Sequence, residues 1–145
     1  MPTFDISFVT IAVAVAANFF FGFIWYTVLF RRAWATEMGF DPDEQPQTGE
    51  MLRGMGLMVV GNFFLAWVFA HNIAVWNPVT WGLPDAGAAP AMYAAMAAFY
   101  TWLGFFIPVL LSSVAWEKKS WKLFGINASY HLLALLLVAM ILTHV

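Results

Sequence analysis

The residues of this sequence that could do chemistry are mostly uncharged polar groups inside long apolar stretches. Six of them are candidate site residues, namely Asn18, Tyr26, Asn62, Asn127, Tyr130 and His131. The last three stand at i, i+3 and i+4, which places them on one face of a helix. Because amides, hydroxyls and imidazoles need hydrogen-bond partners in apolar surroundings, we expect the six to form one polar cluster between helices.

Two functions compete for this cluster. The first is hydrogen bonding between helices, where each bond contributes about 0.6 kcal/mol on average. The second is a site for a substrate, an ion or a proton, because ionisable residues inside a membrane are costly and often functional. His131 is the only residue of this kind well inside a predicted helix, and a neutral imidazole needs only one donor and one acceptor. We therefore favour hydrogen bonding.

The sequence does not indicate catalysis or metal binding. It has no H-E-x-x-H, no G-x-S-x-G and no phosphate-binding glycine loop. Cysteine is absent, which excludes thiolate chemistry, disulfides and cysteine-ligated metals. Asp5, His71, Asp85 and His144 fall on one side of the expected topology but lack the spacing of metal ligands. We expect no enzyme activity, no metal and no cofactor, although the aromatic surfaces could hold a bound lipid.

The elements that position these residues are four long apolar segments. The chain is 63% hydrophobic and 10% charged, whereas a soluble domain carries about 25% charged residues. A bilayer core roughly 30 Å thick needs about 20 apolar residues per helix. A soluble bundle is the rival interpretation, but these segments lack the charged face that its helices would need. The sequence predicts an all-α polytopic membrane protein, a four-transmembrane-helix bundle in one domain over residues 1–145, with spans at about residues 6–30, 54–76, 91–116 and 123–143.

Three connections join the spans, and basic residues divide them into two kinds. The loops of residues 31–53 and 117–122 carry every Lys and Arg of the chain: Arg31, Arg32, Arg53, Lys118, Lys119 and Lys122. The link of residues 77–90 is rich in helix breakers and has no basic residue. Since basic loops stay in the cytosol, we expect a multi-pass protein of the cell (inner) membrane with both loops inside and both termini on the outer face.

Local patterns predict further features of the loops and spans. Trp34 and Met38 stand at i, i+4 in the first loop and indicate a short interfacial turn. The run that begins with Asp41 and Pro42 indicates a helix start, with the aspartate as N-cap and the proline at the first helical position. In the third span, Pro108 removes a backbone donor and predicts a kink.

Tryptophans near the span ends predict two interfacial belts. Trp34, Trp116 and Trp121 would lie on the cytosolic side, and Trp76 and Trp81 on the outer side. The formal net charge of −2 leaves no large basic surface for nucleic acid. The expected partners are therefore the lipid bilayer and either further copies of the chain or a larger membrane complex.

Two stretches of the sequence resemble a known family. The first comprises Gly22-Phe23-Ile24-Trp25-Tyr26, Leu29-Phe30, Trp34 and Met38-Gly39. The second runs from Trp121 to Leu132 and contains the spacing Trp-x-Leu-x-x-x-Asn-x-x-Tyr. Together they resemble the bacterial integral-membrane family catalogued as domain of unknown function 1761, a four-span unit that fills the whole chain. The resemblance implies fold and membrane location, supplies no substrate or catalytic residue, and draws attention to Trp25, Tyr26, Asn127 and Tyr130.

A short internal echo relates the two halves of the chain. Gly22-Phe23 precedes Trp34 by the same spacing as Gly104-Phe105 precedes Trp116. A duplicated hairpin would be a parallel repeat, because the two halves have the same expected orientation. Apolar helices match by chance easily, so the echo alone does not establish duplication.

Three functions fit these observations. We favour a non-enzymatic structural or accessory protein that oligomerises or docks on a larger membrane complex, because the spans lack charged groups and aromatic residues are abundant. The first alternative is a small oligomeric transporter or channel, lined by the polar cluster and hinged at Pro108. The second alternative is a protein that binds a lipid or a quinone through its aromatic faces.

Overall fold

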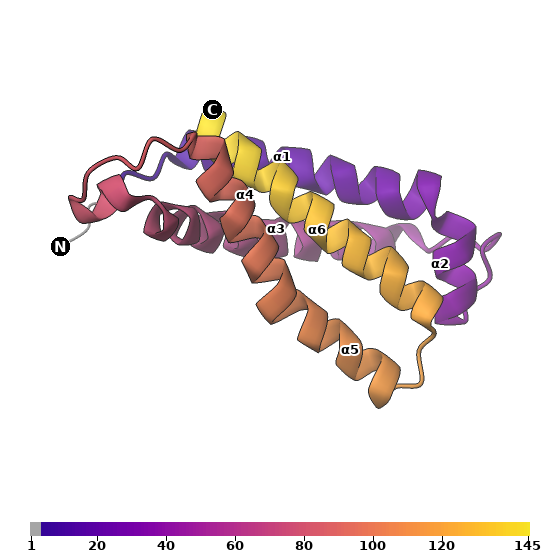
Figure 1. The fold of residues 1–145 in the computed structure, drawn as a ribbon. Helices are drawn as coiled ribbons and strands as arrows, with labels where there is room; N and C mark the ends of the chain where they lie inside the picture. The colour runs from indigo at the N-terminus through magenta and orange to yellow at the C-terminus, as the bar shows by residue number, and fades with distance from the viewer. Residues whose placement is uncertain (1–3) are drawn as a thin grey trace.

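Long helices dominate the computed structural model, which describes residues 4–145. Within these residues the chain forms helices, turns and no strand. The elements are α1 (Phe8–Ile24), η1 (Trp25–Leu29), α2 (Arg31–Met38), α3 (Thr48–Trp76), η2 (Pro78–Trp81), α4 (Pro90–Thr101), η3 (Trp102–Phe106), α5 (Ile107–Ala115) and α6 (Trp121–His144) (Figure 1). The π-helical turns η1 and η3 continue α1 and α4, whereas η2 is a short 3-10 helix.

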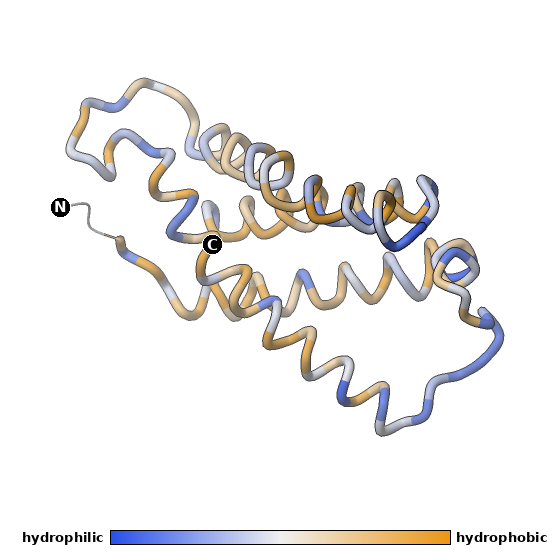
Figure 2. Tube along the Cα trace, turned by 90° about the horizontal axis from the view of Figure 1, so that it is seen from below, coloured by the Kyte–Doolittle hydropathy of each residue, from blue (hydrophilic) through white to orange (hydrophobic). Residues whose placement is uncertain are grey.

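Among the described residues, four helical rods are long and apolar enough to cross a membrane. They are Phe8–Leu29, Thr48–Trp76, Pro90–Ala115 and Trp121–His144. Figure 2 shows hydrophobic residues along these rods and a long hydrophilic stretch at the end opposite the two termini. The predicted all-α fold with four apolar spans is therefore confirmed.

Local sequence explains where several helices begin and end. Ser7 caps α1 by accepting a hydrogen bond from the Thr10 amide, and Ser120 caps α6 by accepting one from the Leu123 amide. The helix α2 ends at Met38, and the next residue, Gly39, has a φ of 79°, the left-handed conformation that glycine adopts most easily. The expected interfacial turn near Trp34 is thus a helix of eight residues.

Two expectations about the first loop were wrong. The run from Asp41 forms a turn instead of a helix, in which Asp41 Oδ1 accepts a hydrogen bond from the Asp43 amide at 2.9 Å. The helix α3 begins at Thr48, six residues before the expected start, so Arg53 lies within it. Its 29 residues span about 44 Å at 1.5 Å per residue, which exceeds the hydrocarbon core and leaves the polar first turns outside it.

The helix α6 is the centre of the bundle and packs mainly against α1 and α4, while α3 packs on α1 (Figure 1). The main core lies in the half of the bundle nearer the termini. It is rich in small side chains, which allow helix backbones to approach closely. Its buried residues are Ile11, Ala14, Ala66, Phe69, Ala94, Ala97, Ala98, Leu135, Val138 and Ala139.

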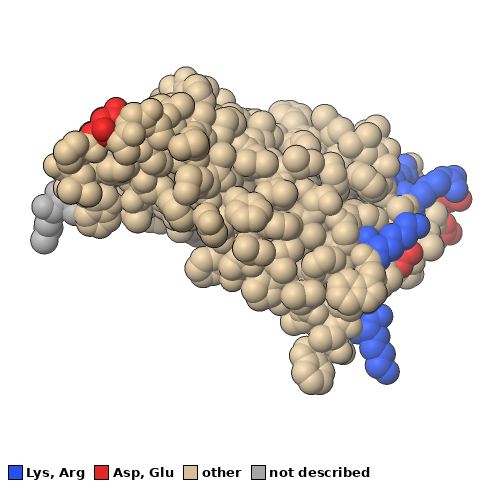
Figure 3. All heavy atoms as spheres, viewed as in Figure 1, with Lys and Arg blue, Asp and Glu red and all other residues tan. Residues whose placement is uncertain are grey.

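The other half of the bundle is more open. Every residue of α3 from 48 to 61 is exposed, and α5 has no buried residue. A second core lies in this half, on the α1 side of α6. Its buried residues are Trp25, Ile126, Tyr130 and Ala134. Figure 3 shows the Lys and Arg side chains gathered at this end of the molecule, opposite the termini.

Candidate functional site

The polar residues expected to form one cluster lie in three separate places. The first is a pair of buried amides that joins α1 to α3, where Asn18 Nδ2 donates to Asn62 Oδ1 at 2.8 Å. The two residues are 2% and 5% exposed. Asn18 Oδ1 and Asn62 Nδ2 have no hydrogen-bond partner among residues 4–145. Asn62 therefore bonds the mid-span Asn18 and not the tyrosine and histidine expected beside it.

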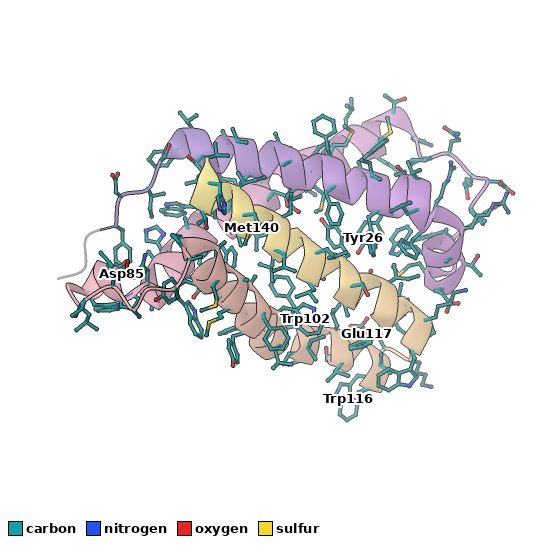
Figure 4. All side chains as sticks on the ribbon, turned by 45° about the horizontal axis from the view of Figure 1, so that its top comes forward. Tyr26, Asp85, Trp102, Trp116, Glu117 and Met140 are labelled. Carbon is teal, nitrogen blue, oxygen red and sulfur yellow. The ribbon has the colours of Figure 1, made fainter. Side chains whose placement is uncertain are left out.

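The second place is the contact between η1 and α6. The Tyr26 hydroxyl donates to Asn127 Oδ1 at 2.9 Å, and Figure 4 shows Tyr26 between the two helical rods. The edge of the Tyr26 ring meets Tyr130, with a centroid distance of 4.9 Å. The family-like motifs of the first and last spans thus contact each other directly.

Tyr130 lies at the centre of this contact. Its ring stacks on Phe21 at a centroid distance of 5.6 Å and lies 6.3 Å from the ring of Trp25. Gly22 faces the hydroxyl, and a Cβ atom at that position would lie 2.8 Å from Tyr130 Oη. Because only a glycine leaves room for Tyr130 here, Gly22 and the surrounding aromatic residues pack as one unit.

His131 occupies the third place, on another side of α6. Its ring lies against Phe106 of η3, with centroids 4.7 Å apart. Within the described part of the chain, the imidazole makes no hydrogen bond to the amides or the tyrosines, and it meets Tyr130 only through a T-shaped ring contact with centroids 5.1 Å apart. Among these residues its surroundings do not resemble a proton relay, because no second titratable group bonds to it.

Two tryptophans hold α6 from opposite sides. Trp25 Nε1 donates to the Ile126 carbonyl at 3.3 Å, and Trp102 Nε1 donates to the Ala128 carbonyl at 2.8 Å. At about 100° per residue these two carbonyls point to nearly opposite faces of the helix. Each tryptophan is the first residue of a π-helical turn, and Figure 4 shows Trp102 between α6 and the rod of α4 and α5. The two turns therefore aim matching donors at one helix.

Pro108 lies just after the second of these turns. It is near the start of α5, and the Ile107 amide donates back to the Trp102 carbonyl, which is the wide hydrogen bond of a π turn. The irregular segment of the third span is therefore Trp102–Phe106, which ends two residues before Pro108.

The expected interfacial tryptophans have different surroundings. Trp116, Trp121 and Trp81 are exposed, as interfacial side chains would be. Trp34 instead packs against Tyr26, with centroids 5.7 Å apart, and Trp76 stacks on Tyr100 at 5.3 Å. These two tryptophans contribute to packing within the bundle.

The basic residues lie at the surface. Arg32 pairs with Asp43 at 3.3 Å, and Lys122 lies 4.0 Å from Glu37 of α2. Exposed pairs of this kind contribute little stability, about 0–1 kcal/mol. The topology-setting role expected of the basic residues from the sequence stays a prediction.

Sequence reasoning missed two polar contacts. Asn72 Nδ2 of α3 donates to Thr101 Oγ1 of α4 at 2.6 Å, and Trp102 bonds α6 as described. The signal for Trp102 was present, since tryptophan favours the membrane interface and this one stands near the middle of a span. An indole at that depth needs an acceptor.

The described residues 4–145 contain no group of three or more His, Asp or Glu side chains that could hold a metal ion. Fold and contacts define a four-span, all-helical membrane protein whose helices are joined by aromatic packing and single hydrogen bonds. The family described as "Protein of unknown function (DUF1761)" matches residues 9–143, so the chain belongs to this family. No curated protein and no solved structure matches the chain.

Proposed function

We propose that this protein is a non-enzymatic structural component of a bacterial inner membrane that assembles with further copies of itself through α3. In this arrangement both termini face outward and the basic loops face the cytosol. The positive-inside rule supports the orientation, because the Lys and Arg side chains gather at the end opposite the termini.

The observation that carries the proposal is the unpartnered first half of α3. Residues 48–61 are all exposed, although the same helix packs closely on α1 farther along. Gly54 and Gly61 stand seven residues apart on one stripe, and a Cβ at either position would meet no neighbouring atom within 4 Å. Small residues on an open stripe let a second helix approach closely, which drives association in lipid where a hydrophobic force is absent.

Charge at the start of α3 favours a second copy as the occupant. Glu50 and Arg53 are exposed, and neither forms a salt bridge within residues 4–145. In a symmetric pair of parallel helices, Glu50 of one copy lies near Arg53 of the other, and the contact occurs twice.

The hydrogen bonds within the bundle favour a structural role over transport. Tyr26 with Asn127, and Asn18 with Asn62, each bond across a helix interface. Groups that line a path for a solute must be accessible to it, whereas Asn18 and Asn62 are 2% and 5% exposed, and the acceptor and donor that their bond leaves over are buried as well.

Cross-linking in native membranes tests the assembly. The chain has no cysteine, so Leu57→Cys on α3 and Val109→Cys on α5 are clean single-cysteine probes. Both positions are similarly exposed, at 62% and 68%. We expect mild oxidation to give a covalent dimer with Leu57→Cys and mostly monomer with Val109→Cys.

A second pair of variants tests the glycine stripe. Gly61→Leu should abolish the dimer, measured as mass in mild detergent and as loss of the Leu57→Cys cross-link. Gly104→Leu is the matched control, since Gly104 is also open but lies on the rod that contains α5. Equal cross-linking of both cysteines, or a wild-type protein that is monomeric in native membranes, would falsify the proposal.

A further inference from the structure

The bundle has a cavity of about 450 Å³ at the end where the termini lie. It is bounded by the segment before α1, the end of α3, the start of α4 and the end of α6. Small-molecule sites have volumes of about 300–1,000 Å³, so the cavity has room for a small ligand or a lipid headgroup. None of the six polar residues considered above lines it.

The cavity presents oxygen atoms and aromatic surface but no basic side chain. Its polar lining includes Asp5, Thr10, Thr80 and Tyr93. Tyr93 Oη is buried and has no hydrogen-bond partner among the described residues, and Thr10 is only 7% exposed. A buried hydroxyl without a partner is uncommon in folded proteins, and a group from outside the chain is one way to satisfy it.

The charged residues around the cavity indicate which chemical class of ligand fits it. Asp5 makes no salt bridge within residues 4–145, and every Lys and Arg belongs to residues 31–53 or 117–122, which lie at the other end of the molecule. His71 and His144 do not line the cavity, and each ring is held by a backbone carbonyl of its own helix. A carboxylate, hydroxyls and the aromatic side chains of Phe4 and Tyr93 together match a cation that donates hydrogen bonds.

We propose that this cavity binds a primary ammonium group. Thr10 and Tyr93 stand in the first turns of α1 and α4, so the site lies at the level of lipid headgroups. The ammonium group belongs either to the headgroup of phosphatidylethanolamine or to a free amine such as ethanolamine. Asp5 provides the counter-charge, and the Tyr93 hydroxyl, which is closed off in this structure, accepts a hydrogen bond once the ligand has displaced its surroundings.

Native mass spectrometry of the full chain in detergent tests the site. Phosphatidylethanolamine and phosphatidylglycerol with identical acyl chains are titrated separately, and we expect the first to bind at least about tenfold more tightly. Asp5→Asn should remove most of this preference. Asp85→Asn is the matched control, because Asp85 is a carboxylate at the same end but does not line the cavity (Figure 4).

Tyr93→Phe separates binding from folding. It removes the unpartnered hydroxyl and keeps the ring, so we expect weaker lipid binding with thermal stability unchanged or raised. Excess free ethanolamine shows which molecule supplies the bound ammonium group. If ethanolamine displaces the lipid, the site binds the soluble amine; if it does not, the site binds the lipid headgroup. Equal binding of the two lipids together with no binding of ethanolamine, or full binding by Asp5→Asn, would overturn the proposal.

Discussion

The two sides of α6 make the same kind of tryptophan contact but differ in how far that contact is buried. Trp25 on one side and Trp102 on the other each begin a π-helical turn. Each donates its indole hydrogen to a backbone carbonyl of α6. After η1 the chain turns into α2, which packs on α6 and encloses Trp25. After η3 the chain continues into α5, which buries none of its residues. The bond fixes where a span meets α6, but the segment that follows decides whether the contact is enclosed.

The glycines of the two sides differ in the same way. A Cβ atom at Gly22 would touch Tyr130, whereas a Cβ atom at Gly104 would have no neighbour within 4 Å. The sequence echo pairs these two glycines, and in that register Trp25 corresponds to Ile107 and not to Trp102. The echo therefore does not describe the structural similarity of the two π turns.

The largest expected effect comes from filling the two glycine positions. Gly22→Ala should destabilise the protein by about 1–3 kcal/mol, because the new methyl group would push the Tyr130 ring out of its stack. Gly104→Ala should be neutral or stabilising by up to about 1 kcal/mol, since the space is open. Unfolding by sodium dodecyl sulfate in mixed micelles gives both values. Equal losses in the two variants would show that the two sides of α6 are packed alike.

We expect a smaller difference in stability between variants of the two tryptophans, Trp25 and Trp102. Trp25→Phe and Trp102→Phe each remove one hydrogen bond to α6, which is worth about 1 kcal/mol. Trp25→Phe should cost more, because its ring also packs on Phe30 with centroids 4.6 Å apart inside the enclosed core. The same unfolding assay measures both. A larger loss for Trp102→Phe would reverse the comparison.

The smallest expected effect concerns single polar contacts. A double-mutant cycle with Tyr26→Phe and Asn127→Ala should give a coupling energy of about 0.6 kcal/mol. His131→Phe is the control, and it should change stability by no more than about 0.5 kcal/mol, since the imidazole makes only ring contacts. A strong effect of His131→Phe on solute flux in liposomes, with stability unchanged, would favour the transporter alternative.

Much of the fold could be predicted because its determinants are local. The four spans follow from uninterrupted apolar runs, and a helix cap such as Ser120 acts within three residues of itself. Prediction failed at Asp41, where a turn and a helix start use the same residue types. It also failed at the start of α3, because apolar length marks the membrane core and not the ends of a helix that extends beyond it.

The sequence by itself determined that this is a four-span membrane protein with its basic residues at one end, since composition along each segment sets its preference for lipid or water. Only the tertiary structure decided which polar groups meet. Asn62 bonds Asn18, Tyr26 bonds Asn127, and His131 turns toward Phe106. The partner of a side chain depends on the rotation and crossing of whole helices. Each π turn adds one residue and shifts the following side chains by about 100°, a change that helical spacing in the sequence does not reveal.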